Sequence, residues 1–178
     1  MSYFSYAPDL PLNTLPIAQK IKGGLRIRLK ATAGLKFSQM SLDRLTFYLA
    51  GRNDVANMLY ELCLATPLGA LVLPANRTAA RWHEFLTPAS IQPVGFSNAE
   101  ALLPVTLRSF QGYRLLQEYF SFPQRFRFFD VAGWAGPSKR ADANELEIVL
   151  LLGRGDPTLE AVVDASNLAL FCTPAINL

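Results

Sequence analysis

The segment ELEIVLLLG, residues 145–153, carries five consecutive apolar residues in a chain of 178. Successive side chains of a β-strand point to opposite faces of a sheet, so a strand with this sequence is apolar on both faces. Strands that are covered on both sides have continuous apolar runs, whereas strands with one wet face alternate. The segment therefore predicts a central strand that is covered by packed layers on both faces.

Shorter segments predict its neighbours. LRIRLKAT (25–32) alternates strictly, with Leu25, Ile27 and Leu29 on one face and cations on the other, which is typical of a half-buried strand. Pro93 cannot donate a ladder hydrogen bond, so SIQPVGF is expected at a sheet edge. In all we expect seven strands, over residues 25–32, 45–51, 70–74, 90–96, 125–133, 145–153 and 167–173.

Apolar residues at helical spacing predict a helix that begins at Asn53 or Asp54 and ends before Pro67. A second helix is expected over residues 110–121, because Pro123 prevents its continuation. A brief third helix is expected to start at Asp156, a side-chain cap that is followed by proline.

Strands and helices do not alternate as they would in a parallel doubly wound sheet. The predicted fold is α+β: a mainly antiparallel, β-sandwich-like domain of about seven strands with two or three short helices. The segments 75–90 and 133–144 are expected to be loops.

One domain is expected, over residues 19–178, preceded by an extended N-terminal segment over residues 1–18. APDLPLNTLPI (7–17) has three prolines among its leucines, so it is expected to lie on a neighbouring surface without joining the sheet. MSYFSY (1–6) is interpreted as a start added to the natural sequence.

The composition is apolar for a chain of this length. Charged residues make up 17% of the chain, against about 25% in an ordinary soluble domain. The apolar runs are too short to span a membrane and no signal peptide is recognisable, so cytoplasmic residence is expected. The net charge of +3 is too small to indicate nucleic-acid binding. Cys63 and Cys172 are interpreted as buried hydrophobic residues.

Chemistry-bearing residues are sparse. His83 is the only histidine, and no cysteine lies at ligand spacing from it, so no metal or nucleophile site is predicted. Glu145 and Glu147 share one strand face, as paired acid and base carboxylates can, but a solvated edge shows the same pattern. No phosphate-binding glycine loop is present. The five cations of residues 20–30 are interpreted as a solvated strand face, although a phosphate backbone could also lie along them.

The segment RSFQGYRLLQEYFSFPQRFRFFD, residues 108–130, holds eight aromatic rings. Tyr113, Leu116 and Phe120 form one helical stripe, which we expect to be buried, with Arg114, Gln117 and Glu118 in water. Aromatic density also raises a carbohydrate-binding β-sandwich module as an alternative function. A hydrolase with a site in one of the two loops is a third alternative.

The same segment, followed by ELEIVLLL (145–152) and CTPAINL (172–178), resembles the TssF family of type VI secretion baseplate proteins, also called ImpG or VasA. Four shorter segments agree in order and spacing: LTFYLAG (45–51), LYELCL (59–64), PVGF (93–96) and EALLP (100–104). The resemblance extends from about residue 10 onward. Members of the family are several times longer, so this chain would be an internal part of a longer protein.

The resemblance implies a structural subunit of a contractile injection machine, without catalytic residues, cofactor, metal or small-molecule substrate. It implies TssG, TssK and another TssF copy as partners, and a place at the inner face of the bacterial inner membrane without insertion into it. Six matching residues are interpreted as fold or interface positions: Arg108, Gly112, Tyr113, Arg114, Glu118 and Tyr119.

Overall fold

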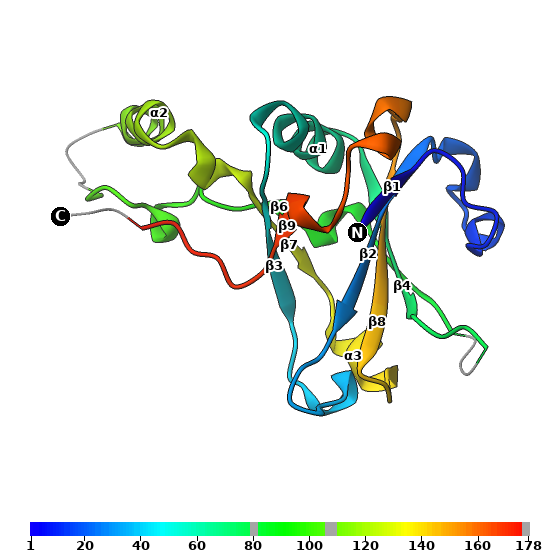
Figure 1. Cartoon of the computed structure of the whole chain (residues 1–178). Helices are drawn as coiled ribbons and strands as arrows, with labels where there is room; N and C mark the ends of the chain where they lie inside the picture. Colours follow the sequence, from blue (N-terminus) through cyan, green and yellow to red (C-terminus); the bar gives the residue numbers. More distant parts are fainter. Residues whose placement is uncertain (79–81, 106–109, 176–178) are drawn as a thin grey trace.

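The structure is a computed structural model that describes residues 1–78, 82–105 and 110–175. Two antiparallel sheets face each other, and three α-helices lie around them (Figure 1). The predicted α+β sandwich is confirmed, although the described residues form nine strands where seven were expected.

The first sheet has the predicted buried strand at its centre. Its five strands, in spatial order, are β1 (Ser2–Phe4), β2 (Gly23–Lys30), β8 (Glu145–Leu152), β4 (Pro67–Pro74) and β5 (Glu84–Leu86). Ile148 of β8 pairs with Ile27 on one side and with Val72 on the other. The central position expected for 145–153 is therefore confirmed.

Both faces of β8 are covered, which explains its continuous apolar sequence. Ile148 and Leu150 point into the core between the sheets, whereas Val149 and Leu151 point outward. On the outer face, Val149 and Leu151 pack against Ala7, Leu10 and Leu15 of the N-terminal segment. That segment lies on the sheet as expected, but it forms two 3-10 turns, Leu12–Thr14 and Ala18–Lys20, so it is not extended throughout. Residues 2–4 are part of the sheet, and Tyr3 is buried.

The second sheet is smaller. Its four strands, in spatial order, are β6 (Ile91–Pro93), β7 (Phe128–Ala132), β3 (Arg44–Leu49) and β9 (Leu168–Ala169). The edge position predicted for Pro93 is confirmed. Phe47 of β3 stacks on Phe129 of β7 with ring centroids 5.4 Å apart, and both rings are fully buried.

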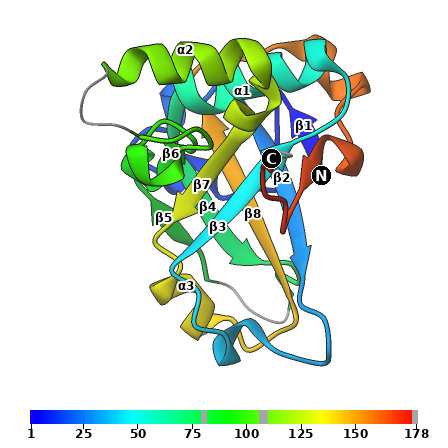
Figure 2. The same cartoon turned by 90° about the vertical axis from the view of Figure 1, so that its left-hand side faces the viewer.

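Helices close the two ends of the sandwich. Helix α1 (Asn53–Ala65) lies over one end and α3 (Ala135–Arg140) lies at the other (Figures 1 and 2). Helix α1 was predicted, and its buried residues are apolar. They include Cys63, and burial raises the pKa of its thiol to about 12. Helix α3 falls in a segment that was expected to be a loop. It follows Trp134, which is buried and donates its ring N–H to the carbonyl of Val131 at 2.8 Å.

Several predicted elements differ in type or length, and the strand predicted over residues 90–96 is limited to Ile91–Pro93. Residues 123–127 form a 3-10 turn before β7, because Pro123 starts a new turn instead of a strand. Strand β9 has two residues, since Phe171 has a φ of 58° and leaves the extended conformation. The helix expected after Asp156 is a 3-10 turn, Pro157–Ala161, and the Asp156 carboxylate caps it as predicted.

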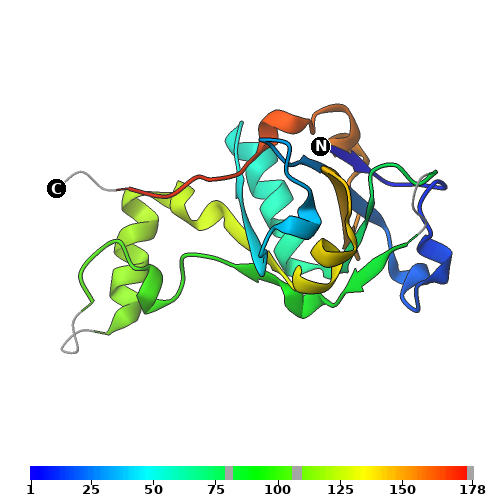
Figure 3. The ribbon, with the colours of Figure 1, turned by 90° about the horizontal axis from the view of Figure 1, so that it is seen from below.

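A lobe extends from the side of the sandwich. It consists of residues 95–105, helix α2 (Gln111–Ser121) and the 3-10 turn Pro123–Arg127, with residues 170–175 running past it (Figure 3). Cys172 lies on this passing segment and is exposed, so its predicted burial is wrong. No helix in the described ranges is both long and apolar enough to cross a membrane.

Candidate protein interface

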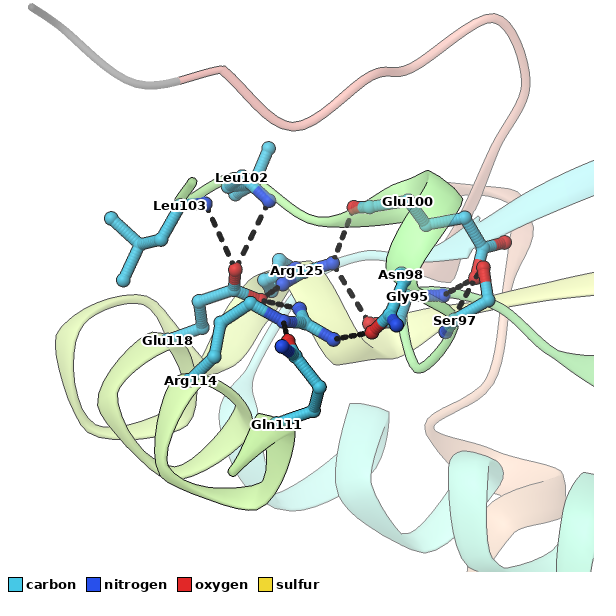
Figure 4. Close-up of polar contacts among 10 residues, drawn as sticks. All are labelled: Gly95, Ser97, Asn98, Glu100, Leu102, Leu103, Gln111, Arg114, Glu118 and Arg125. Carbon is cyan, nitrogen blue, oxygen red and sulfur yellow. Dashed lines mark hydrogen bonds and ion pairs between the residues drawn. The ribbon is translucent and has the colours of Figure 1, made fainter. Parts of the chain in front are cut away.

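The lobe is held together mainly by a buried polar cluster, beside which the buried ring of Phe126 contacts Phe96 and Tyr119. Helix α2 buries only two of its side chains, Arg114 and Glu118. Both point toward Arg125 and the loop at residues 95–103 (Figure 4). A buried charge is tolerated only when other groups neutralise and hydrogen-bond it, so the partners of these two residues decide how the lobe packs.

Glu118 is the centre of the cluster. Its Oε1 accepts hydrogen bonds from the backbone N–H groups of Leu102 and Leu103, each at 3.0 Å. Its Oε2 pairs with Arg114 Nη1 at 3.0 Å and with Arg125 Nη1. The carboxylate therefore ties one turn of α2 both to the preceding loop and to the turn that follows the helix.

The two arginines extend the cluster. Arg125 donates from Nη2 to the carbonyls of Gly95 and Glu100, both at 2.8 Å. Arg114 donates from Nη2 to Asn98 Oδ1 at 3.4 Å. Loss of hydration, reinforced by the positive charge of Arg114, lowers the pKa of Arg125. An arginine still keeps its proton in such a site, so the pair stays ionic.

Glu100 caps the loop that receives Arg125. Its Oε2 accepts from the hydroxyl of Ser97 at 2.7 Å and from the backbone N–H groups of Ser97 and Gly95 at 3.1 Å. Desolvation on its own would raise the pKa of Glu100, but these hydrogen bonds and the charge of Arg125 together lower it. Gly95 has a φ of 104°, a conformation in which a side chain would be strained.

The predicted helix is present, but its predicted orientation is wrong. Tyr113, Leu116 and Phe120 were expected in the core, yet they are 70%, 55% and 80% exposed. Arg114 and Glu118, which were expected in water, are buried. The cause is the ionic cluster, because four donors converge on Glu118 and turn the polar side of α2 inward.

The aromatic residues of α2 thus form an outward surface, which we call the α2 aromatic face. It comprises Phe110, Tyr113, Leu116, Gln117, Tyr119 and Phe120, all of which are exposed. It carries no charged side chain. An exposed apolar patch of this kind on a globular protein marks a surface that binds another molecule.

The residues predicted at the site separate into two groups. Arg114 and Glu118 lie together in the cluster, whereas Tyr113 and Tyr119 lie on the outer face. Gly112 allows the ring of Phe110 to fold back over the helix, where a Cβ would meet it. Arg108 lies outside the described residues. Whether these positions contact a partner stays a prediction.

Sequence reasoning missed Arg125, Asn98 and Glu100 as members of the cluster. Arg125 was placed in the strand predicted over residues 125–133, and the other two lay outside the predicted strands and helices. The signal that could have found them is SNAE (97–100), because a serine followed three residues later by glutamate is a capping box.

The other candidate groups are engaged in structural pairs. Glu147 is 1% exposed and pairs with Arg77 at 2.7 Å, with Arg26 and Arg28 farther away at 3.5 and 3.6 Å. Glu145 pairs with Lys30 at 3.4 Å. Arg77 and the cations of β2 therefore neutralise the two glutamates on the outer face of the sheet. Within the described residues, no group of three or more histidine, cysteine, aspartate or glutamate side chains is placed to hold a metal ion.

Comparison with known proteins identifies the family. The family model described as "Type VI secretion system, TssF" matches residues 2–178. The type VI secretion system component TssF1 of Pseudomonas aeruginosa is 45% identical over 159 residues, which are 89% of this chain and 25% of that protein. The chain therefore spans about a quarter of the length of this curated relative.

A solved structure agrees. One chain in the cryo-electron microscopy structure of the type VI secretion system TssK-TssF-TssG baseplate subcomplex superposes with a TM-score of 0.63 and 27% sequence identity. The match covers 83% of this chain and 27% of that one. Because the family model extends over residues 2–178, it includes MSYFSY from Ser2 onward, and Ser2–Phe4 form β1. With this likeness in sequence and in fold, the chain belongs to the TssF family of the type VI secretion system.

Proposed function

We propose that this chain is a structural part of a type VI secretion baseplate, in which it holds other subunits by lasting protein contacts. The observation that carries the proposal is the α2 aromatic face, which is uncharged and aimed outward by a buried ionic cluster. Stable subunit interfaces are depleted in charge and enriched in aromatic residues at their centres. Membership of the TssF family indicates that the assembly to which such a surface would belong is the type VI secretion baseplate.

The partners follow from the solved relative. That protein is part of a TssK-TssF-TssG subcomplex, so we propose TssG and TssK as partners here, with a further TssF copy as a third candidate. The baseplate role places the protein in the cytoplasm, at the inner face of the inner membrane when assembled. We further propose that the chain is an internal part of a longer protein, because it spans 25% of the curated relative. The proposed role needs no catalytic residues, and the ion-paired state of Glu118 and Glu147 supports a structural use of these carboxylates.

The carbohydrate-binding alternative has weaker support. A sugar stacks on flat aromatic surfaces, but the exposed rings of α2 meet edge to face, at 88° for Phe110 with Tyr113 and 80° for Tyr119 with Phe120. Trp134, an aromatic residue in the segment 133–144 that was expected to be a loop, is fully buried and offers no surface to a sugar. A glycan array bound by the protein and lost in Tyr113→Ala would favour the alternative.

Co-purification tests the baseplate proposal. The full-length protein, tagged and expressed with TssG and TssK, is expected to elute with both under gentle conditions. The control is an unrelated tagged protein of similar size in the same cells. Elution of the protein alone, with TssG and TssK soluble in the same lysate, would contradict the proposal.

A further inference from the structure

The α2 aromatic face is large for the surface of a single chain. Five of its side chains are more than half exposed: Phe110 at 73%, Tyr113 at 70%, Leu116 at 55%, Tyr119 at 52% and Phe120 at 80%. At roughly 150–250 Å² for each aromatic side chain, the exposed area is on the order of 600 Å². This equals the upper end of the largest patch on a typical monomer, which is about 300–600 Å² and often functional.

The face has the periodicity of a helix-packing seam. Phe110, Tyr113, Gln117 and Phe120 follow one another at spacings of three, four and three residues. This spacing brings side chains onto one line along a helix, and it is the spacing by which a second helix packs its ridges between them. Leu116 and Tyr119 widen the line on one side.

The face is held in place before a partner arrives. Glu118, on the opposite side of α2, is fixed by Arg114, Arg125 and two backbone N–H groups. Rotation of α2 about its axis would break these contacts and leave buried charges unpaired. A surface that is already fixed loses little conformational freedom on binding, which favours association.

From the seam and its fixed orientation, we propose that the α2 aromatic face is the docking site for an α-helix of a different subunit of the assembly. The contacting side of that helix is apolar and uncharged, apart from one polar residue opposite Gln117, whose amide needs a hydrogen-bond partner once it is covered. The proposed function, on which this inference rests, is the reason for expecting the helix to belong to a different subunit.

Other occupants fit less well. A membrane-surface helix carries lysine and arginine beside its apolar face, whereas the cation of α2, Arg114, is buried. A second copy that used this face alone would bury on the order of 600 Å² on each side, less than the roughly 800 Å² per partner of a standard stable interface. Any single partner would bury the same area on this face, so the face fits one part of a larger contact, and the proposed function supplies the different subunit that makes it.

A groove beside the face extends the site. It has a volume of about 440 Å³ and lies between the start of α1, at Asn53 and Asn57, and the end of the lobe, at Tyr119 and Phe126. Arg127 donates to Asn53 Oδ1 at 3.0 Å and joins the two sides. A large side chain of the docked helix would enter this groove next to Tyr119.

Photocrosslinking tests both the partner and its secondary structure. A photoreactive benzoylphenylalanine replaces Phe110 or Phe120 in the full-length protein inside cells that hold the whole secretion system, and crosslinked peptides are identified by mass spectrometry. The two positions are ten residues apart on α2, at a rise of about 1.5 Å per residue. The expected result is one helical segment of another subunit, with the two contact points about ten residues apart.

A charge variant provides the second measurement. Phe120→Lys places a cation on the seam, at a position that is already exposed. The variant is therefore expected to keep the circular dichroism spectrum and the unfolding midpoint of the wild-type protein. Association with the crosslinked subunit is expected to fall at least about tenfold, because the cation would be desolvated in the interface. Phe171→Lys is the matched control, since Phe171 is 97% exposed but lies outside the face.

Four results would overturn the inference: crosslinks to a second copy, crosslinks within the same polypeptide, two contact points only about four or five residues apart, as on a strand that rises about 3.3 Å per residue, or unchanged association in Phe120→Lys. These outcomes are separate from a failure of the proposed function. If the unmodified protein does not co-purify with TssG and TssK, the baseplate proposal fails, while the crosslinked peptide still decides whether a helix of another subunit occupies the face.

Discussion

Glu118 sets the direction in which α2 faces, at the scale of single residues. It is 3% exposed and contacts two arginines and two backbone N–H groups. Replacement of a buried ion pair by apolar residues is often tolerated, but removal of one partner leaves a charge without compensation. The cluster is therefore sensitive to the loss of Glu118, whose carboxylate pairs with both arginines.

Glu118→Gln is expected to destabilise the protein by about 3–5 kcal/mol, because the buried Arg114 and Arg125 would then lose the carboxylate that pairs with both of them. Urea denaturation measures the change. Glu145→Gln is the control, since Glu145 and Lys30 form an exposed pair and such pairs contribute about 0–1 kcal/mol. Equal changes in the two variants would show that the cluster does not hold the lobe.

Phe120 and Phe129 provide a second comparison of single residues. Phe120 is 80% exposed and Phe129 is fully buried. Phe129→Ala is expected to cost about 3–5 kcal/mol, the usual cost of removing a buried aromatic ring. Phe120→Ala is expected to change stability by no more than about 0.5 kcal/mol. Thermal or urea unfolding of both variants checks the orientation of α2, and a large loss in Phe120→Ala would show that the ring is buried.

At the scale of elements, the N-terminal segment depends on a few ion pairs as well as on apolar packing. Asp9 accepts from Arg26 at 2.8 and 2.9 Å and from the side chain of Arg77 at 3.0 Å. Arg77 also donates to the carboxylate of Glu147 in β8. These contacts fasten the segment over the outer face of the first sheet, where Leu10 and Leu15 cover Val149 and Leu151.

This attachment is expected to weaken in acid. The hydrogen bond from Arg26, assisted by Arg77, lowers the pKa of Asp9 from 3.8. When the pKa of a carboxyl group is lower in the folded protein than in the unfolded chain, ionisation of that group stabilises the fold. This contribution is complete at a pH above the unfolded pKa, and it is lost as the pH falls through the folded pKa. Between about pH 5 and pH 2.5, Asp9→Asn should therefore lose less stability than the wild-type protein. Parallel stability curves for the two proteins would contradict the prediction.

The comparison of β8 with α2 shows what the sequence could predict about elements. The central place of β8 was predictable, because a strand that is apolar on both faces has to be covered on both. The type and bounds of α2 were predictable too, but its rotation was not. Periodicity identifies the apolar side of a helix, while the inference that this side faces the chain's own core assumes that no partner exists. Arg114, one of the four donors to Glu118, lies four residues before it on the helix, but the other three are Leu102, Leu103 and Arg125, contacts that no local pattern contains.

At the scale of the whole molecule, the low charge content agrees with a subunit that is covered in use. Charged residues make up 17% of the sequence, and several of them are consumed by the buried cluster and by the ion pairs around Glu147. The lobe consequently presents aromatic rings where a free-standing protein would present charges. The core of the sandwich is buried within this chain, and in the proposed assembly the lobe supplies the surface for association.

The exposed rings should be detectable in the isolated protein with the dye ANS, which fluoresces when it binds apolar surface. ANS is an anion and the chain carries a net charge of +3, so the test requires variants that keep this charge. Phe110→Ser with Phe120→Ser removes two rings of the α2 aromatic face and is expected to abolish most of the fluorescence. Tyr6→Ser with Phe171→Ser removes two exposed rings that lie outside the face, at 82% and 97% exposure. Because isolated apolar side chains are ordinary on protein surfaces and only contiguous ones form a binding patch, this control should keep its signal. Equal loss in the two double variants would mean that the rings of α2 act singly and not as one surface.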